Sequence, residues 1–362
     1  MTEKKSTLIE TPREKYDFVP DEKICYDVII IGTGIVGWSA AMYTGRLGLK
    51  TLIIGEMPGG TITQTHVVEN YPGFISLSGP ELAQKVENHA RDYDIDILLG
   101  KVEKIEKNKS NLFVVLTKKQ KFNSKTIIYA TGSKWKKLGV PGEKELENKG
   151  VSYCALCDGP LYKGKEVAMV GGSDSAVKES LLLSEYANKV YIIYRGEKVH
   201  PEPINLKRME EKVEQGKIEV INNTNITEIK GSDGFVSSVV LDKPFEGKTE
   251  LSLYGVFVAI GHIPLSDLAK EIGVKINAKG EIIIDRKAQT NVPGFYASGD
   301  VADTSFKQAI TGVGEGVAAA YNAYEYVNKG NYVMPTNSEM NENKKITPLI
   351  RTKTKSKTAK KK

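Results

Sequence analysis

A β-branched run that leads into a glycine-rich turn and a helical pattern constrains the fold of this chain most. Residues 26–31 read Tyr-Asp-Val-Ile-Ile-Ile, which is typical of a parallel strand covered on both faces. The following turn fits G-x-G-x-x-G, with Gly32, Gly34 and Gly37 at its fixed positions. The first glycine permits a tight turn, the second lets a pyrophosphate approach the backbone, and the third lets helix pack on strand. In this strand–turn–helix context the pattern predicts a dinucleotide-binding βαβ unit.

A second, altered copy of the pattern follows the strand predicted at residues 167–170. Its turn reads G-x-S-x-x-A over residues 171–176, so Ser173 stands where the close approach of a pyrophosphate favours glycine. The strand predicted at residues 190–194 ends before Arg195, whose guanidinium can meet a ribose 2′-phosphate. Two such units in 362 residues predict an α/β protein with two Rossmann-like three-layer domains.

Between the two units, Cys154-Ala155-Leu156-Cys157-Asp158 forms a C-x-x-C pair followed by a carboxylate. In a chain without secretory features, this spacing indicates a redox-active pair rather than a structural one. The alternatives are half of a zinc site or two buried apolar cysteines. Zinc takes four N or S ligands, and the chain offers only Cys25 and four scattered histidines besides the pair. We therefore expect no metal, and the position between two nucleotide signatures favours electron transfer between a flavin and a protein partner.

The composition sets further limits on the class of protein. No apolar run approaches about 18 residues, and the start of the chain lacks a charged-then-apolar signal segment. Three cysteines argue against a disulfide framework and for a reducing compartment, so we expect a cytoplasmic protein without membrane association. The formal net charge of +6 is concentrated in residues 331–362, which hold nine basic and two acidic residues. We predict a disordered basic tail there and a flexible arm at residues 1–23. Binding of nucleic acid or another polyanion by the tail is less favoured than a solvated tail.

The order of the remaining elements predicts one domain inserted into another. A strand at residues 126–129 ends in a small-residue turn, and a later one delivers Asp300, whose carboxylate suits a sugar-alcohol hydroxyl. A final helix over residues 307–327 has its N-terminus free to face an electron-rich ring. We therefore predict a discontinuous domain of residues 24–133 and 263–330, interrupted by an inserted domain of residues 134–262.

In this order, the motifs resemble those of the low-molecular-weight thioredoxin reductases. These are FAD-dependent pyridine nucleotide-disulfide oxidoreductases with an FAD domain and an inserted NADPH domain. The matching stretches span about 300 residues: 32–37, 59–60, 68–73, 130–132, 154–158, 171–176, 259–264, 296–301 and 307–311. The resemblance implies a thioredoxin-disulfide reductase with FAD as cofactor, NADPH or NADH as donor and a thioredoxin-like protein as partner. It also implies a homodimer.

The resemblance assigns roles to individual residues of this sequence. Cys157 is implied as the flavin-proximal sulfur, Cys154 as the sulfur that attacks a partner disulfide, and Asp158 as the acid/base. Hinges are implied near residues 133–137 and 259–264. The implied FAD contacts are Gly32, Gly34, Gly37, Glu56, Gly60, Thr61, Asn70, Gly132, Asp300, Gln308 and Ala309. The implied NAD(P)H contacts are Gly171, Gly172, Ser175, Ala176 and Arg195.

The chain departs from the family pattern mainly at the donor site. Of the family's His-Arg-Arg…Arg set for the 2′-phosphate, aligned with Tyr194, Arg195, Gly196 and His200, only Arg195 survives. The sequence therefore predicts a weakened NADPH site. It leaves open a reductase with a non-nicotinamide donor such as ferredoxin, a flavin-dependent dithiol oxidase that passes electrons to oxygen, and a binding protein that keeps FAD structurally.

Overall fold

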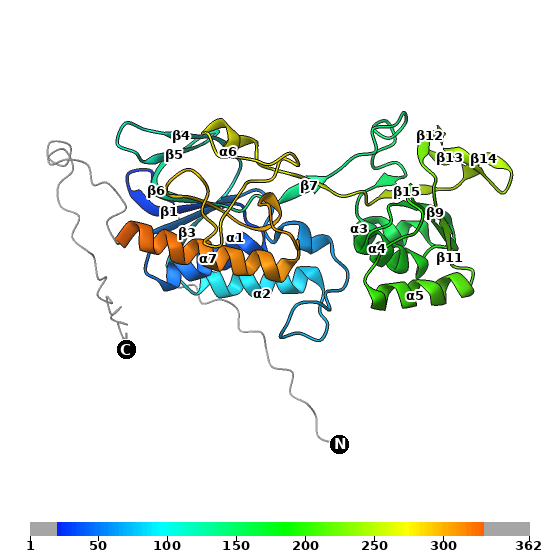
Figure 1. The fold of residues 1–362 in the computed structure, drawn as a ribbon, viewed down its shortest axis with the longest axis horizontal. Helices are drawn as coiled ribbons and strands as arrows, with labels where there is room; N and C mark the ends of the chain where they lie inside the picture. The colour runs from blue at the N-terminus through cyan, green and yellow to red at the C-terminus, as the bar shows by residue number, and fades with distance from the viewer. Residues whose placement is uncertain (1–19, 329–362) are drawn as a thin grey trace, which may run out of the picture.

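The structure is a computed structural model that describes residues 20–328. The predicted tail at residues 331–362 lies outside the described residues, as does most of the predicted arm. Figure 1 shows two lobes side by side, one built from both ends of the described chain and the other from its middle.

The first lobe is built on a seven-stranded sheet. Its order is β3-β2-β1-β6-β5-β4, with β17 added to β6. The three strands β1, β2 and β3 run parallel, β6 and β17 continue this direction, and β4 and β5 are antiparallel to their neighbours. The bounds are β1 Cys25–Ile31, β2 Thr51–Gly55, β3 Ile95–Leu99, β4 Val102–Lys107, β5 Phe113–Thr117, β6 Lys121–Tyr129 and β17 Phe295–Ala297.

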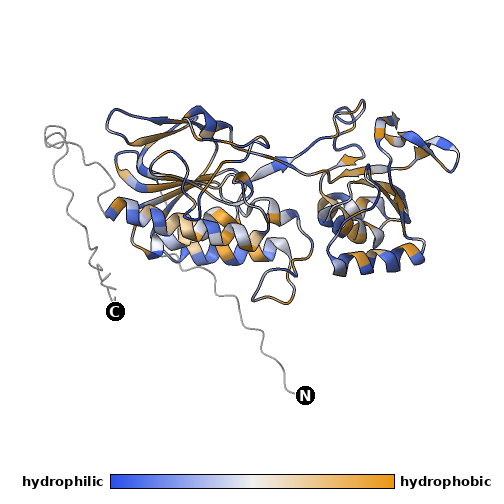
Figure 2. Cartoon of the chain, in the orientation of Figure 1, coloured by the Kyte–Doolittle hydropathy of each residue, from blue (hydrophilic) through white to orange (hydrophobic). Residues whose placement is uncertain are grey.

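Alternate side chains of β1 enter two different cores. Val28 and Ile30 pack in the cluster that holds Trp38 and the alanines of the helices, whereas Ile29 lies in the cluster on the opposite face with Phe113. Both faces of β1 are buried, which is why residues 28–31 form a continuous run of apolar side chains. The helices of this lobe are α1 Ile35–Arg46, α2 Gly79–Arg91, α6 Asp267–Glu271 and α7 Ala309–Asn328. Figure 2 shows hydrophobic residues concentrated on the central strands of both lobes.

The second lobe has a five-stranded parallel sheet in the order β11-β10-β9-β15-β8. Its strands are β8 Val151–Ser152, β9 Glu166–Val170, β10 Lys189–Ile193, β11 Ile218–Ile221 and β15 Gly255–Val258. One face packs on the helices α4 Asp174–Ser184 and α5 Pro203–Glu214, and the other face packs on a three-stranded antiparallel sheet. That sheet contains β12 Ile226–Ser232, β13 Phe235–Phe245 and β14 Lys248–Ser252. The predicted fold class, α/β with two Rossmann-like three-layer units, is confirmed.

A single pair of short strands lies between the lobes. β7 Ser133–Trp135 runs antiparallel to β16 His262–Pro264, and the Trp135 and His262 ring centroids are 4.4 Å apart. Both segments predicted as hinges therefore meet in one ribbon, which Figure 1 shows at the waist of the molecule near β7.

The start of α7 differs from its sequence-based prediction. The helix begins at Ala309, not at residue 307, because Gln308 occupies the capping position: its carbonyl accepts from the Gly312 amide at 3.0 Å and its own amide donates to the Thr311 hydroxyl at 3.1 Å. Among the helices of residues 20–328, none combines the length and apolar character that a membrane span needs.

Candidate functional site

A cavity of about 1170 Å³ opens at the carboxyl ends of β1 and β6 and extends to the side of the second lobe. Leu156 and residues of α4 and α5 contribute to its wall. Ten of the eleven predicted FAD contacts line it: Gly32, Gly34, Glu56, Gly60, Thr61, Asn70, Gly132, Asp300, Gln308 and Ala309. The eleventh, Gly37, lies behind the turn and does not reach the cavity. The structure thus brings together residues that lie up to 277 positions apart (32 to 309) in the sequence.

The three glycines of the first turn are required for different reasons. Gly32 has φ +118°, and a Cβ there would lie 2.1 Å from the Ala130 carbonyl oxygen. A Cβ on Gly37 would lie 1.9 Å from the Gly32 carbonyl oxygen, because helix and turn are in contact. A Cβ on Gly34, in contrast, would meet nothing closer than 3.8 Å, and one on Gly132 nothing within 4 Å. The protein itself leaves these last two positions open, which fits a cradle for a pyrophosphate.

We therefore expect Gly34→Ala to weaken FAD binding and Gly37→Ala to weaken the fold. Gly34→Ala should fold with a thermal midpoint close to that of the wild type, yet lose at least about tenfold in FAD affinity, because its methyl group enters the cavity. Gly37→Ala should lower the thermal midpoint, because its methyl group overlaps the backbone. Flavin absorbance per chain and thermal unfolding of both variants measure this contrast. A Gly34→Ala protein that retains full FAD would show that no ligand approaches that glycine.

Two buried hydroxyl groups on the cavity wall have no partner in the described chain. Thr33 is 2% exposed and Ser298 is 1% exposed, and neither Oγ atom forms a hydrogen bond within the protein. An unpaired buried hydroxyl costs about 1–3 kcal/mol, so such groups indicate a polar ligand or water. Together with the open glycines, they fit a bound dinucleotide such as FAD.

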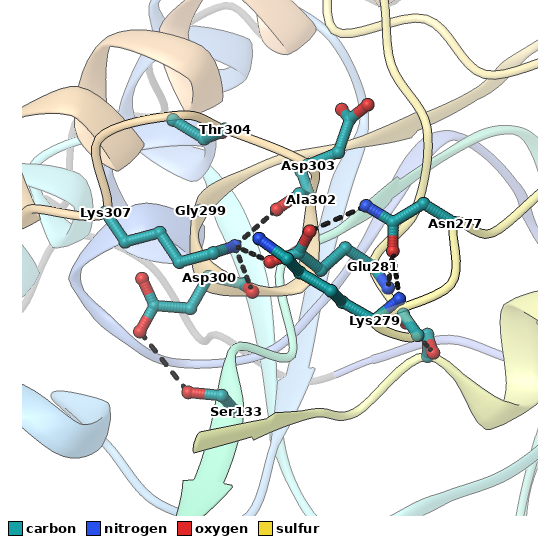
Figure 3. Close-up of polar contacts among 12 residues, drawn as sticks. Ser133, Asn277, Lys279, Glu281, Gly299, Asp300, Ala302, Asp303, Thr304 and Lys307 are labelled. Carbon is teal, nitrogen blue, oxygen red and sulfur yellow. Dashed lines mark hydrogen bonds and ion pairs between the residues drawn. The ribbon is translucent and has the colours of Figure 1, made fainter. Parts of the chain in front are cut away.

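The turn that carries Asp300 is held by a lysine (Figure 3). The Lys307 ammonium donates to the Asp300 carbonyl at 2.9 Å and to the Ala302 carbonyl at 2.5 Å, and it pairs with Glu281 at 3.2 Å. The Asp300 carboxylate accepts from the Ser133 hydroxyl at 3.3 Å, which ties it to the first residue of β7. On the other side of the turn, the Glu315 carboxylate accepts from the Gly299 amide at 2.9 Å. Asp300 is thus presented to the cavity by a network that fixes its backbone.

The beginning of α7 meets the loop that follows the first βαβ unit. Asn70 Nδ2 donates to Gln308 Oε1 at 3.0 Å, so two residues predicted for FAD from opposite ends of the chain are in contact. Nearby, Trp135 Nε1 donates to Gln64 Oε1 at 3.1 Å, which joins the inter-lobe ribbon to the cavity wall. Burial lowers the pKa of His262, against the opposing effect of the Asp300 carboxylate, and its ring is tilted by 38° against that of Trp135.

The two cysteines of the pair form a disulfide at the start of the short helix α3 Ala155–Asp158. Cys154 is the N-cap residue, and its sulfur accepts from the Cys157 amide at 3.1 Å. Cys154 is 9% exposed, whereas Cys157 is exposed. Neither sulfur is on the cavity wall, but Leu156 between them is. Among residues 20–328, no group of three or more His, Cys, Asp and Glu is placed to hold a metal ion.

Two further groups beside the disulfide were not predicted from the sequence. The Ser152 hydroxyl lies 2.6 Å from Asp158 Oδ2. Burial raises the pKa of Glu179 on α4 to about 7, with an opposing effect from the backbone amide of Ala155. Neither residue belongs to a recognisable pattern. Their only sequence signal is a serine two positions before the first cysteine and a carboxylate inside a predicted helix.

The predicted NAD(P)H contacts are divided in space. Ser175 lines the large cavity, but Gly171, Gly172, Ala176 and Arg195 do not. The turn is instead covered by Tyr194: a Cβ on Gly172 would lie 2.6 Å from its ring, and a Cβ on Gly196 would lie 2.5 Å from it. The His200 amide donates to the Gly172 carbonyl at 2.8 Å, which lays that segment along the turn. Tyr194 therefore fills the space between the turn and the loop that would read a 2′-phosphate.

Known proteins with a similar sequence and fold agree with this geometry. A family model for pyridine nucleotide-disulphide oxidoreductases matches residues 26–316. The thioredoxin reductase of Bacillus subtilis is 40% identical over 309 residues, which cover 85% of this chain and 96% of the relative. The crystal structure of Lactococcus lactis thioredoxin reductase in its FR conformation has a TM-score of 0.78 at 38% identity and covers 84% of this chain and 99% of its own. The crystal structure of T. acidophilum thioredoxin reductase also has a TM-score of 0.78, at 36% identity, and covers 83% of this chain and 98% of its own. The chain therefore belongs to the pyridine nucleotide-disulphide oxidoreductases and, within them, to the low-molecular-weight thioredoxin reductases, which are FAD-dependent disulfide oxidoreductases.

Proposed function

We propose that this flavoenzyme passes electrons from FAD to the Cys154–Cys157 disulfide and from there to a thioredoxin-like protein. The observation that carries the proposal is the disulfide itself, formed beside a carboxylate on a helix whose Leu156 reaches the cavity that fits FAD. FAD, when bound, supplies a carrier of two electrons. The residues predicted to hold it are the glycine turn, Glu56, Asn70, Asp300 and the start of α7.

The dithiol residues have distinct roles in this proposal. Cys154 is the attacking sulfur: after reduction its thiolate keeps the hydrogen bond from the Cys157 amide, which stabilises negative charge. Cys157 is assigned the flavin-facing role, and because it does not line the cavity in the present orientation, it meets the flavin only after the lobes move. Asp158 transfers the proton that exchange with a disulfide requires. The relatives named above favour this direction of flow over the dithiol oxidase.

We further propose that the inserted unit, residues 134–262, rotates against residues 24–133 and 263–330. Cys154 is 9% exposed in the present orientation, so a partner protein reaches it only after a movement. The antiparallel ribbon of β7 and β16 supports a hinge there, and a bidentate ion pair spans the lobes, with Arg208 Nη1 2.8 Å and Nη2 3.3 Å from the Glu69 carboxylate. This exposed pair is worth about 0–1 kcal/mol, so it biases the orientation without locking it. We also propose that the protein forms a homodimer and is located in the cytoplasm.

Anaerobic titration of the holoenzyme with candidate donors tests this function. NADPH, NADH and a reduced ferredoxin are added separately, and the flavin absorbance is followed before and after addition of an oxidised thioredoxin. We expect at least one donor to bleach the flavin and the thioredoxin disulfide to restore its colour. Persistent bleaching in the presence of oxidised thioredoxin, with colour returning only on exposure to oxygen, would contradict the proposal and favour the oxidase.

A further inference from the structure

Ser152 connects the acid/base carboxylate to the attacking cysteine. Its hydroxyl oxygen lies 2.6 Å from Asp158 Oδ2, 3.2 Å from the Cys154 amide nitrogen and 3.4 Å from the Cys154 carbonyl oxygen. The residue is 4% exposed and lies at the end of β8, where it pairs with Phe257 of β15. The hydroxyl is therefore fixed by the central sheet, and Asp158 is anchored to the sheet through it.

The donors and acceptors around Ser152 Oγ determine how the single hydroxyl proton is used. The Cys154 amide can only donate, so the serine oxygen accepts from it. The hydroxyl proton then goes to one of two oxygens, and the Asp158 contact, at 2.6 Å, has the short length typical of a charge-assisted O–H···O⁻ bond. Oδ2 is thereby occupied as an acceptor. A proton carried by Asp158 is left to Oδ1.

We propose that Ser152 is a positioning residue for dithiol–disulfide exchange, which holds Oδ2 of Asp158 so that Oδ1 carries the proton to and from sulfur. This inference rests on the proposed function. In this inference Ser152, which lies outside the C-x-x-C-D sequence, orients the Asp158 carboxyl group that transfers the proton.

The dithiol and Asp158 together supply all the protons and electrons that reduction of the partner disulfide needs. The Cys154 thiolate attacks the partner disulfide, a Cys154–partner bond forms, and the first partner sulfur leaves with the proton from Oδ1 of neutral Asp158. The Cys157 thiol then gives its proton to Asp158 and attacks the Cys154 sulfur. The second partner sulfur leaves, takes this proton from Asp158, and the Cys154–Cys157 disulfide closes. Two electrons and two protons have passed to the partner.

The test separates exchange that needs a proton from exchange that does not. The holoenzyme is reduced with dithiothreitol and desalted anaerobically, so that the electron donor plays no part. The rate of its reaction is then measured with two small disulfides. Glutathione disulfide releases an alkyl thiolate that requires a proton, whereas Ellman's reagent releases an aromatic thiolate that is stable without one.

We expect Ser152→Ala to slow the reaction with glutathione disulfide at least about tenfold, and the reaction with Ellman's reagent by less than about twofold. Ser152→Thr keeps the hydroxyl and should react with both at close to the wild-type rates. Ser238→Ala is a matched control, because Ser238 is also 4% exposed in the same lobe and also lies 2.6 Å from a carboxylate, that of Glu250. It should leave both rates unchanged.

If Ser152→Ala slows both reactions by the same factor, or slows neither of them, the inference is overturned. A folded Ser152→Thr protein that has lost the glutathione reaction would also overturn it, and this result is available even where the alanine variant does not fold. In the Asp158→Asn background, Ser152→Ala should add nothing further, since the serine acts through that carboxyl; a full additional tenfold loss would contradict this. A wild-type dithiol that reacts with neither reagent and with no oxidised thioredoxin would refute the proposed function itself, which is a distinguishable outcome.

Discussion

Cys157→Ser is expected to keep bound FAD and lose at least about a thousandfold in thioredoxin reduction. The serine cannot form the disulfide with Cys154, and residues that act as one unit lose nearly all activity when one member is removed. The FAD contacts do not include Cys157, so the yellow colour should remain. Turnover with an oxidised thioredoxin, measured beside the flavin absorbance per chain, gives both results.

The reciprocal variant distinguishes the two sulfurs. Cys154→Ser should lose turnover equally, but it leaves Cys157, the sulfur proposed to meet the flavin, as a free thiol. A thiolate next to a flavin produces a long-wavelength absorption band, which we expect in this variant and not in Cys157→Ser. Cys25→Ser serves as the control, because Cys25 is the free cysteine at the start of β1 and should turn over normally. Wild-type rates in either disulfide variant would show that the assigned roles are wrong.

Poor use of NADPH is the second large effect expected. Recognition of a 2′-phosphate depends on charge-assisted hydrogen bonds of roughly 1.5–3 kcal/mol each, and Gly196 and His200 replace two of the expected arginines. Because charged networks are not additive, we expect a loss of about two orders of magnitude in NADPH affinity relative to a site with all three arginines. NADH should be used equally poorly or slightly better. A wild-type enzyme with micromolar KM and fast turnover for NADPH would contradict this prediction.

Restoring the site requires three substitutions. The sequence suggests Gly196→Arg with His200→Arg, but a Cβ on Gly196 would lie 2.5 Å from the Tyr194 ring, so an arginine there meets the tyrosine. We therefore expect the two arginine substitutions alone to raise kcat/KM for NADPH only weakly. Adding Tyr194→His should raise kcat/KM for NADPH by at least about tenfold more, while kcat/KM for NADH stays nearly unchanged. Arg195→Ala in the triple variant is the control and should reverse the gain for NADPH alone. Equal gains with two and three substitutions would show that Tyr194 does not obstruct the site.

The elements with strong local signals were predicted well from the sequence. The apolar run of β1, the turn after it and the helix α1 follow from residues that are adjacent in the chain. The C-x-x-C pair was likewise readable, and the disulfide is formed. The local pattern singled out Asp300, but only the resemblance placed Asp300 and Gln308 at the FAD site, and both lie far from the turn in sequence. No local sequence pattern predicts that Asp300 contacts Ser133 or that Gln308 contacts Asn70.

What the sequence did not reveal depends on tertiary contacts. Lys307 reads as a helix residue, and only the folded turn shows that its ammonium caps the Asp300 and Ala302 carbonyls. Tyr194 was noted as a missing histidine, but its packing against Gly172 and Gly196 depends on how the loop folds back over the turn. Ser152 has no pattern at all, because one serine before a cysteine pair is uninformative until the Asp158 carboxylate is placed beside it.

The discontinuity of the first lobe has a consequence for the newly made protein. The strand β17 and the helix α7 are synthesised after the entire second lobe, yet β17 joins the sheet beside β6 and α7 packs against α1. Asp300, Gln308 and Ala309 reach the cavity with them. A ribosome-bound chain that has emerged only as far as β16 can fold the middle lobe as a unit, but its cofactor pocket still lacks one side. The cavity that fits FAD therefore gains the residues that precede and begin α7 only after the whole second lobe has been synthesised.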